Sequence, residues 1–477
     1  MEVTVPTWVA LSLGFISIIV RWVWSVLDWV WLKPKKLERC LREQGLKGNS
    51  YRLLYGDMKE NSILLKQANS KPMNLSTSHD IAPRLIPLVE QTVKTCGKNS
   101  FVWQGPIPRV IIMNSEDLKD VFTKLDDFHK PKSNPLLKLL AAGLLRYEGE
   151  KWAKHRRIIN PAFHLEKLKQ MLPAFHTSID EMINNWESLA SKEGSSCVLD
   201  IWPSLQNLTA DVISRTAFGS SYQEGMKIFE LLKEQEGYAV KYIQSVYIPG
   251  WRFLPTKMNR RMKEIDKEIK GLLKGIINKR EKTIMAGEAT KNDLLGALLE
   301  SKFKDVQEHG KNNKNIGMSI EDVIEECKLF YFAGQETTSV LLVWTMVLLG
   351  QNQNWQDRAR KEVLQVFGSN KPDFDRLPHL KVVTMILLEV LRLYPAAVVI
   401  SRTTQKKIQF GRFSLPAGVE VGLPILLIHR DKELWAKLAI ALILQHFTFE
   451  LSPSYAHAPS APMIRPQYGA PIILHKR

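Results

Sequence analysis

Cysteine is scarce in this sequence, and its placement excludes several kinds of protein. No two cysteines have the C-x-x-C spacing, and the four that occur among 477 residues lie far apart, at Cys40, Cys96, Cys197 and Cys327. This pattern argues against a structural zinc site and a disulfide framework, and it fits a reducing compartment. Because no cysteine follows Cys327, the C-terminal part of the chain also offers no thiolate to a metal.

Acidic residues are also scarce relative to basic ones. Lys and Arg together number 66, and Asp and Glu number 49, which gives a formal net charge of +17. Such an excess favours anionic lipid, an acidic protein or nucleic acid as a partner, although it also describes an ordinary solvated basic surface. The sequence has no basic motif interleaved with aromatic residues and no helix-turn-helix signature, so we predict no nucleic-acid partner.

Repeats and low-complexity tracts are absent as well. With 45% hydrophobic and 24% charged residues, the chain is predicted to fold around a large core. Apolar residues recur with helical spacing through most of the chain, whereas strand-like runs cluster late, at 396–400, 407–410 and 419–428. We therefore predict a mainly α fold with a smaller β region, in a single domain that covers residues 33–477.

The N-terminal segment is predicted to be a membrane anchor. No charged residue occurs from Val3 to Val20, and this stretch is apolar enough to form a membrane helix. The tryptophans between positions 22 and 31 fit an interfacial aromatic belt, and the basic residues that follow fit a positive-inside flank. Residues 1–32 would then form a single-pass anchor, with the body in the cytosol. A cleaved signal peptide is the alternative, but Glu2 replaces the usual basic start and no small-residue cleavage site follows.

A long helix is predicted to begin after Ser319, which is placed to cap it, and to run to Leu349. It carries the first chemical motif, Ala333-Gly334-Gln335-Glu336-Thr337-Thr338. Gly costs a helix about 1 kcal/mol relative to Ala, so Gly334 is expected to have a compensating role. It would let a planar cofactor or O2 approach the backbone, while Glu336 and Thr337 relay protons. The alternative is a kinked, buried helix whose threonine hydroxyls donate to carbonyl oxygens one turn earlier.

Glu389 and Arg392 form the second motif, in a helix predicted to begin near Leu380 and to end at Tyr394. Their i, i+3 spacing places both charges on one face. A surface ion pair is the ordinary explanation. Because the rest of the helix is strongly apolar, we predict instead a buried pair that contributes specificity more than stability.

The two motifs, in this order and at this distance, resemble the oxygen-binding helix and the Glu-x-x-Arg helix of the cytochrome P450 family. Trp152-Ala-Lys-His-Arg156 is similar to the family's Trp-x-x-x-Arg helix, and Arg402 in Ser-Arg-Thr-Thr is similar to a further haem contact. The resemblance implies the cytochrome P450 fold and a haem cofactor. It also implies three site roles: Trp152, Arg156 and Arg402 at the haem propionates, Gly334 beside the cofactor, and Glu389 with Arg392 as support of the haem site.

Segments at 35–39, 245–251 and 451–455 resemble one plant branch of this family, which includes secologanin synthase and triterpenoid oxidases. Members are anchored in the endoplasmic reticulum membrane and take electrons from an NADPH-dependent flavoprotein reductase. They hydroxylate apolar small molecules such as terpenoids. The resemblance therefore implies membrane lipid, that reductase and an apolar, terpenoid-like substrate as partners, and the basic charge of the chain would suit an acidic reductase.

One part of the family pattern is missing. The family has a Phe-x-x-Gly-x-Arg-x-Cys-x-Gly loop before its final long helix, whereas here Lys432-Glu433-Leu434-Trp435 runs directly into Ala436-Lys437-Leu438. The resemblance thus implies an internal truncation near 435–436 that removes the haem-ligating cysteine, and no metal ligand is predicted. Cys327 would lie on the oxygen side of the haem, roughly 10 Å along the helix from Gly334. His429 or His446 would give iron a non-thiolate ligand.

Two functions follow from these observations. In the first, the chain is a haem-thiolate monooxygenase of apolar molecules, which requires that the protein made in the cell contain the missing loop. In the second, the chain as written is a catalytically inactive, membrane-anchored relative. We predict the second for the literal sequence, because O–O cleavage by the thiolate route needs a sulfur ligand on the iron.

Overall fold

The computed structural model describes residues 7–74, 80–97, 100–113, 115–124, 126–131, 134–192, 196–220, 222–287, 293–308, 317–411, 413–424, 447–460 and 464–476. The junction between Trp435 and Ala436 lies outside these residues, as do His429 and His446. The predicted truncation and the two histidine alternatives therefore concern a part of the chain that the structure does not describe.

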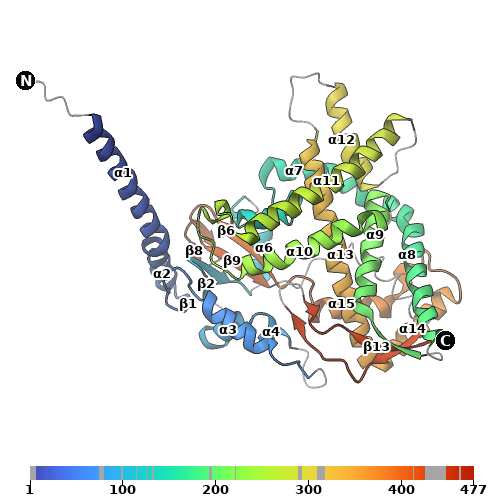
Figure 1. Cartoon of the computed structure of the whole chain (residues 1–477). Coiled ribbons are helices and arrows are strands. Elements are labelled where there is room, and N and C mark those ends of the chain that lie inside the picture. The colour runs from blue at the N-terminus through green and yellow to red at the C-terminus, as the bar shows by residue number, and fades with distance from the viewer. Residues whose placement is uncertain are drawn as a thin grey trace, which may run out of the picture.

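The N-terminal helix stands away from the rest of the molecule (Figure 1). Helix α1 (Thr7–Leu27) continues through one π-helical turn (Asp28–Leu32) into α2 (Lys33–Glu43), which joins the body. The stretch from Gly14 to Glu43 is long and apolar enough to cross a membrane, and the most apolar part of it is not buried by the body. Its tryptophans are exposed or half-buried. The apolar N-terminal helix expected from the sequence is thus present.

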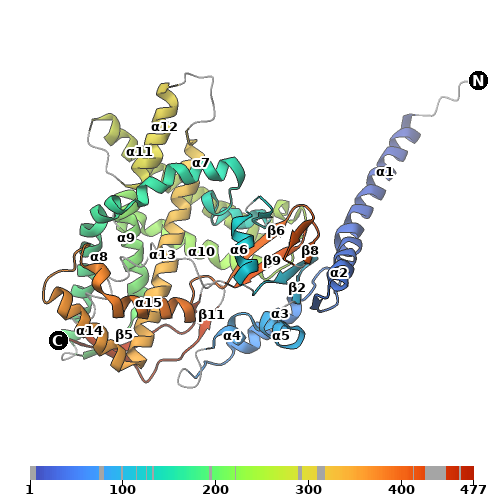
Figure 2. The same cartoon turned by 180° about the vertical axis from the view of Figure 1, so that it is seen from behind.

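Helices form most of the body, and a smaller sheet region lies between them and the N-terminal helix (Figures 1 and 2). This confirms the predicted mainly α class. Besides those above, the helices are α3 (Met58–Asn69), α4 (Ala82–Leu85), α5 (Pro87–Cys96), α6 (Ser115–Thr123), α7 (Gly149–Ile159), α8 (Leu165–Lys192), α9 (Ile201–Phe218), α10 (Tyr222–Ile243), α11 (Lys257–Met285), α12 (Leu294–Glu308), α13 (Ile320–Gln351), α14 (Gln353–Phe367) and α15 (Lys381–Leu393).

Helix α13 runs through the middle of the body, with α9 beside it in both views (Figures 1 and 2). The hydroxyl of Ser319 accepts a hydrogen bond from the Asp322 backbone N–H at 3.1 Å, which confirms the predicted cap. From Val340 to Leu349 every side chain is buried, so this half of the helix is apolar on all sides and forms the core of the body. It passes the same length and composition test as a membrane span, but it is mostly buried inside the protein.

The strands form one larger sheet and several small ones. The six-stranded sheet has the order β1-β2-β3-β9-β6-β4, and a three-stranded sheet has the order β10-β13-β5. The strands are β1 (Lys47–Gly48), β2 (Ser100–Gln104), β3 (Ile107–Ile111), β4 (Phe128–His129), β5 (Ser196–Asp200), β6 (Val399–Thr404), β7 (Ile408–Phe410), β8 (Phe413–Leu415), β9 (Glu420–Pro424), β10 (Phe447–Leu451), β11 (Pro459–Ser460), β12 (Arg465–Pro466) and β13 (Pro471–Lys476).

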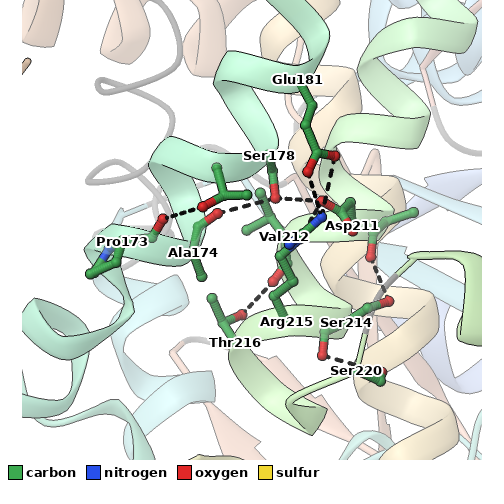
Figure 3. A network of polar contacts seen from close by, with 12 residues as sticks. Pro173, Ala174, Ser178, Glu181, Asp211, Val212, Ser214, Arg215, Thr216 and Ser220 are labelled. Atoms are coloured by element: carbon green, nitrogen blue, oxygen red, sulfur yellow. Dashed lines mark hydrogen bonds and ion pairs between the residues drawn. The ribbon is translucent and has the colours of Figure 1, made fainter.

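A polar network fixes α9 against α8 (Figure 3). The buried carboxylate of Asp211 accepts hydrogen bonds from the Ser178 hydroxyl and from the Arg215 guanidinium, both at 2.6 Å. Arg215 also donates to Glu181 of α8 at 2.9 Å. The buried carboxylate of Asp211 therefore has two hydrogen-bond donors, which hold α9 in position against α8. Helix α9 in turn packs against the part of α13 that carries the chemical motif.

Candidate active site

Gly334 lies on α13 where this helix packs against Ile213 of α9. A Cβ atom added at this position would stand 2.7 Å from the Cγ1 atom of Ile213, well inside van der Waals contact. The absence of a side chain is therefore needed for this helix pair to pack, which accounts for a glycine that would otherwise weaken the helix. A role of Gly334 beside the cofactor stays a prediction.

Glu336 is buried and ion-paired. Its carboxylate accepts a hydrogen bond from the guanidinium of Arg465 on β12, and the same guanidinium donates to Glu236 of α10. Burial raises the pKa of Glu236, partly offset by Arg465. Burial alone would lower the pKa of Arg465, but the carboxylates, Glu336 foremost, raise it above its usual value. The acid of the motif is thus held in a buried cluster of two carboxylates and one cation.

Thr337 donates its hydroxyl hydrogen to the carbonyl oxygen of Ala333, one turn earlier, at 2.8 Å. This is the contact expected from the alternative interpretation of the motif, in which threonine hydroxyls bond back to the helix. On α9, Thr209 donates to the carbonyl oxygen of Gln335 at 3.0 Å, so the motif's backbone also receives an external donor. Proton delivery by Glu336 and Thr337 stays a prediction.

The predicted burial of the Glu389–Arg392 pair is wrong. The two side chains meet on one face of α15, with nitrogen–oxygen distances of 2.7 and 2.6 Å, but they are 51% and 60% exposed. The opposite face of α15 packs in the core through Val383, Leu387 and Val390. The apolar residues of α15 determine which face packs in the core, and the charged pair on the other face is exposed. The carboxylate of Glu389 raises the pKa of Arg392.

A groove of about 490 Å³ lies beside the pair, lined by Leu348, Leu349, Asn352, Trp355, Met385, Ile386, Glu389, Val390 and Leu393.

The three residues expected at the haem propionates differ in how deeply they are buried. Trp152 is half-buried on α7, and Arg402 is half-buried on β6. Burial lowers the pKa of Arg402, and Glu148 partly offsets that effect. Arg156 is exposed, and within the described residues it makes no recorded hydrogen bond or ion pair. The role of these three residues at haem propionates stays a prediction.

A buried hydrogen bond between His155 and Glu326 joins α7 to α13. The Nδ1 atom of His155 and a carboxylate oxygen of Glu326 are 2.6 Å apart, and both side chains are almost fully buried. Glu326 also accepts the backbone N–H of Leu144 at 3.2 Å. Because His155 lies one turn from Trp152 on α7, this pair sets the position of Trp152 relative to the oxygen motif. Neither His155 nor Glu326 was predicted from the sequence as a site residue.

Lys130 is a third residue that was not predicted from the sequence. It follows β4 directly, and its ammonium lies 5.9 Å from the centre of the Trp152 ring. It donates hydrogen bonds to the carbonyl oxygens of Leu144 and Tyr147, at 2.8 and 2.7 Å. Burial, aided by the charge of Arg402, lowers its pKa to about 8, although Glu148 acts in the opposite direction. Two half-buried cations thus influence each other at one edge of the site.

The residues present fit haem on one side only. Lys130, Arg402 and Trp152 gather cationic and aromatic groups of the kind that hold carboxylates. As a candidate iron ligand, Cys327 is fully buried within α13, and burial raises the pKa of its thiol, which disfavours the thiolate. Across the described ranges, no group of three or more His, Cys, Asp or Glu side chains is arranged to hold a metal ion. Burial thus argues against Cys327 as the sulfur ligand, and no cysteine follows it in the sequence.

Known proteins share both sequence and fold with this chain. The family model described as Cytochrome P450 matches residues 87–438. Cytochrome P450 CYP72A219 of Panax ginseng is 53% identical, over 96% of this chain and 97% of its own length. The 11-oxo-beta-amyrin 30-oxidase of Glycyrrhiza uralensis is 50% identical, over 98% of both chains. The structure of retinoic acid bound cyanobacterial CYP120A1 superposes with a TM-score of 0.69, over 91% of this chain and 99% of that one. At 19% identity it supports the fold alone.

The relatives also contain residues that this chain lacks. Cytochrome P450 72A15 of Arabidopsis thaliana is 49% identical over an alignment of 522 residues that covers 100% of both chains, whereas this chain has 477 residues. Several tens of aligned positions therefore have no counterpart here, although the alignment length does not place them. The matched family model, the high identity along nearly the whole length and the shared fold together show that this chain belongs to the cytochrome P450 family.

Proposed function

We propose that this chain belongs functionally to the haem-dependent monooxygenases that act on apolar, terpenoid-like molecules. We also propose that its sequence as it stands lacks the residue needed to complete the iron site. One observation carries the first part: about half of all residues are shared with plant relatives along nearly their whole length, and one of these is named an 11-oxo-beta-amyrin 30-oxidase. Haem, when bound by members of the family, supplies the activation of O2.

The roles proposed for individual residues follow from where they lie. Trp152 and Arg402 would hold the haem propionates, with Arg156 entering only if α7 brings its exposed side chain to them. Gly334 would keep the backbone of α13 accessible. Glu336 and Thr337 would move protons, which requires Glu336 to exchange its bond with Arg465 for one with a water or a substrate. Glu389 and Arg392 would support the haem site from α15.

The setting proposed for the protein is the endoplasmic reticulum membrane. The apolar helix α1 would be a single-pass anchor with the body facing the cytosol, and an NADPH-dependent flavoprotein reductase would supply electrons. The exposed tryptophans at the end of this helix and the basic residues of α2 support this orientation. Membrane lipid and an apolar small molecule complete the proposed partners, and no nucleic acid is among them.

A second candidate function is that of a catalytically inactive, anchored relative. It is favoured by a specific observation, the absence of any cysteine after Cys327, and by the exposure of the Glu389–Arg392 pair. Without a sulfur ligand the thiolate route to O–O cleavage is closed, and the protein would act through binding of lipid, reductase or apolar ligand.

Microsomes that contain this chain, sequence-verified across the Trp435–Ala436 junction, together with an NADPH-dependent reductase distinguish the two. We expect no oxidation product from 11-oxo-β-amyrin or related triterpenoids with this chain. A matched variant that carries the family's cysteine loop between these two residues is expected to restore haem-thiolate chemistry. Turnover by the verified 477-residue chain would overturn the second candidate, and inactivity of the loop-restored variant would count against the first.

A further inference from the structure

A buried histidine lies between two tyrosines near the end of the chain. His457 is 3% exposed and belongs to the segment that joins β10 to β11. Its Nδ1 atom is 2.8 Å from the hydroxyl oxygen of Tyr455, and its Nε2 atom is 3.2 Å from the hydroxyl oxygen of Tyr394. Both ring nitrogens of this histidine therefore face a phenol, in a part of the molecule that the proposed function does not use.

The two phenols differ in their access to solvent. Tyr394, at the C-terminal end of α15, is fully buried, whereas Tyr455 is half-buried. Backbone hydrogen bonds hold the segment that carries Tyr455 and His457. The N–H of Tyr455 donates to the carbonyl oxygen of Ser452 at 2.8 Å, and the carbonyl oxygen of His457 accepts from the N–H of Met73 at 2.6 Å. One tyrosine is thus partly accessible from outside, and the histidine and the other tyrosine are shut off from water.

The contact lengths indicate how protons are shared in this group. A neutral imidazole has one N–H donor and one bare nitrogen, so it accepts a hydrogen bond from one phenol and donates to the other. The short contact suits an O–H donor and the longer one an N–H donor. The hydroxyl of Tyr455 therefore donates to Nδ1 of His457, and Nε2–H donates to the oxygen of Tyr394. A phenol and a base at this separation are in reach of direct proton transfer.

Burial raises the pKa of both Tyr394 and Tyr455. Phenolate is therefore disfavoured at either position, and a tyrosine here does not release its proton by itself. Loss of an electron changes this, because an oxidised phenol is a strong acid and needs an acceptor for its proton. The bare nitrogen of His457 is such an acceptor, so Tyr455 can lose an electron and a proton in one step.

Trp344 of α13 completes the group. Its ring stacks on that of Tyr394, with the ring centres 4.5 Å apart and an angle of 15° between the planes. Its Nε1–H donates to the carbonyl oxygen of Ile464 at 2.5 Å, which fixes the ring. The ring of His457 lies 5.3 Å from that of Trp344 and 5.9 Å from that of Tyr394, nearly perpendicular to both. Aromatic rings at such distances attract a cation, which helps the buried imidazole to carry a second proton.

We propose that Tyr455, His457, Tyr394 and Trp344 form a redox-active site that gives one electron to oxidants of the peroxyl-radical class. Tyr455 loses the electron, its O–H bond breaks, and the proton forms an N–H bond at Nδ1 of His457. The products are a neutral tyrosyl radical, an imidazolium and a peroxide anion, which takes a proton from water. A one-electron reductant such as ascorbate then supplies an electron, and Nδ1 returns the proton to the phenol oxygen. No iron takes part in either step.

Peroxyl radicals from a photolysed, water-soluble azo initiator test the proposal. After the light is switched off, the full chain in detergent micelles is expected to retain a tyrosyl radical, followed by electron paramagnetic resonance. This radical should decay severalfold more slowly than the radicals of exposed tyrosines, because the imidazolium holds its proton nearby. Tyr455→Phe should remove the long-lived signal. His457→Gln, which keeps hydrogen-bonding groups but provides no base, should remove it as well.

Tyr468→Phe is the matched control, because Tyr468 is 49% exposed and its hydroxyl accepts a hydrogen bond from the side-chain amide of Gln467. It should leave the long-lived signal unchanged. A parent chain without a long-lived radical would overturn the proposal. Persistence of the signal in Tyr455→Phe, or its equal loss in Tyr468→Phe, would overturn it too.

A second measurement uses the parent chain alone, so it does not depend on how the variants fold. The oxygen of the trapped radical should accept a hydrogen bond from the N–H at Nδ1 of His457. Hyperfine spectroscopy of samples prepared in H2O and in D2O should therefore detect an exchangeable hydrogen next to this oxygen. A radical that lacks such a coupling would contradict the proposal. Absence of monooxygenase activity would leave both measurements unaffected, so a failure of the function proposed above is distinguishable from a failure here.

Discussion

Replacing Arg465 by methionine leaves two buried carboxylates, Glu236 and Glu336, without the guanidinium that joins them. Both carboxylates are almost fully buried, at 8% and 5% side-chain exposure, whereas the arginine is 25% exposed. Removal of one partner from a buried ion pair costs about 3–5 kcal/mol, because a charge is left uncompensated. The partial exposure of Arg465 moves the expected loss of unfolding free energy toward the lower end, at about 3 kcal/mol.

The loss should depend on pH in a defined direction. Burial already raises the pKa of Glu236, and removal of Arg465, which opposes that effect, raises the pKa further. A carboxyl whose pKa is higher in the folded than in the unfolded state contributes its full stability below the unfolded pKa, and that contribution is lost as pH rises through the folded pKa. Arg465→Met should therefore destabilise the chain most at neutral pH and least near the usual glutamate pKa of about 4.3.

Urea unfolding of the full chain in detergent, followed by far-UV circular dichroism, measures this difference. Two further variants sharpen the result. Arg392→Met removes the arginine of an exposed pair and should cost only about 0–1 kcal/mol, because water screens such pairs. Adding Glu236→Gln and Glu336→Gln to Arg465→Met should recover much of the loss, because neutral amides no longer need the cation. A loss below about 1 kcal/mol, or no recovery in the triple variant, would refute the reasoning.

Two other substitutions have clear expected outcomes. Gly334→Ala places a Cβ atom 2.7 Å from Ile213, so it should lower the thermal midpoint and cost about 1–3 kcal/mol despite the better helix propensity of alanine. The double variant with Ile213→Ala should recover part of that loss, and an unchanged midpoint in the single variant would contradict the close packing. His155→Leu removes the imidazole that is hydrogen-bonded to the buried Glu326 carboxylate, and it should cost about 1–3 kcal/mol in the same melt, mostly regained with Glu326→Gln. Failure of that second change to restore stability would show that the pair is not what fixes α7.

Helix periodicity was sufficient to predict the elements that carry the motifs. The run of apolar residues and the capping serine placed α13 to within two residues, and the helix that contains Glu389 ends where the sequence indicated. These features depend on neighbours in the sequence, so local rules can identify them. The class of the fold followed from the same patterns.

Burial and long-range partners could not be obtained in this way. Periodicity shows which side chains share a face of α15, but not whether another segment covers that face, and Glu389 with Arg392 proved exposed. Arg465 reaches Glu336 across 129 positions of sequence, and no local signal connects them. The charge of Arg402 acts on Lys130, but the strand that precedes Lys130, β4, has only two residues and is too short for a recognisable alternation.

The carbon monoxide difference spectrum of the reduced chain tests the central claim most directly. The protein should be verified by mass spectrometry across the Trp435–Ala436 junction, and its haem content should be measured on the same sample. The account predicts that the verified 477-residue chain shows no thiolate-type Soret band, whether or not haem is retained, because no cysteine follows Cys327. A thiolate-type band from the verified chain would contradict it, since a sulfur ligand would then reach the iron from one of the four cysteines present.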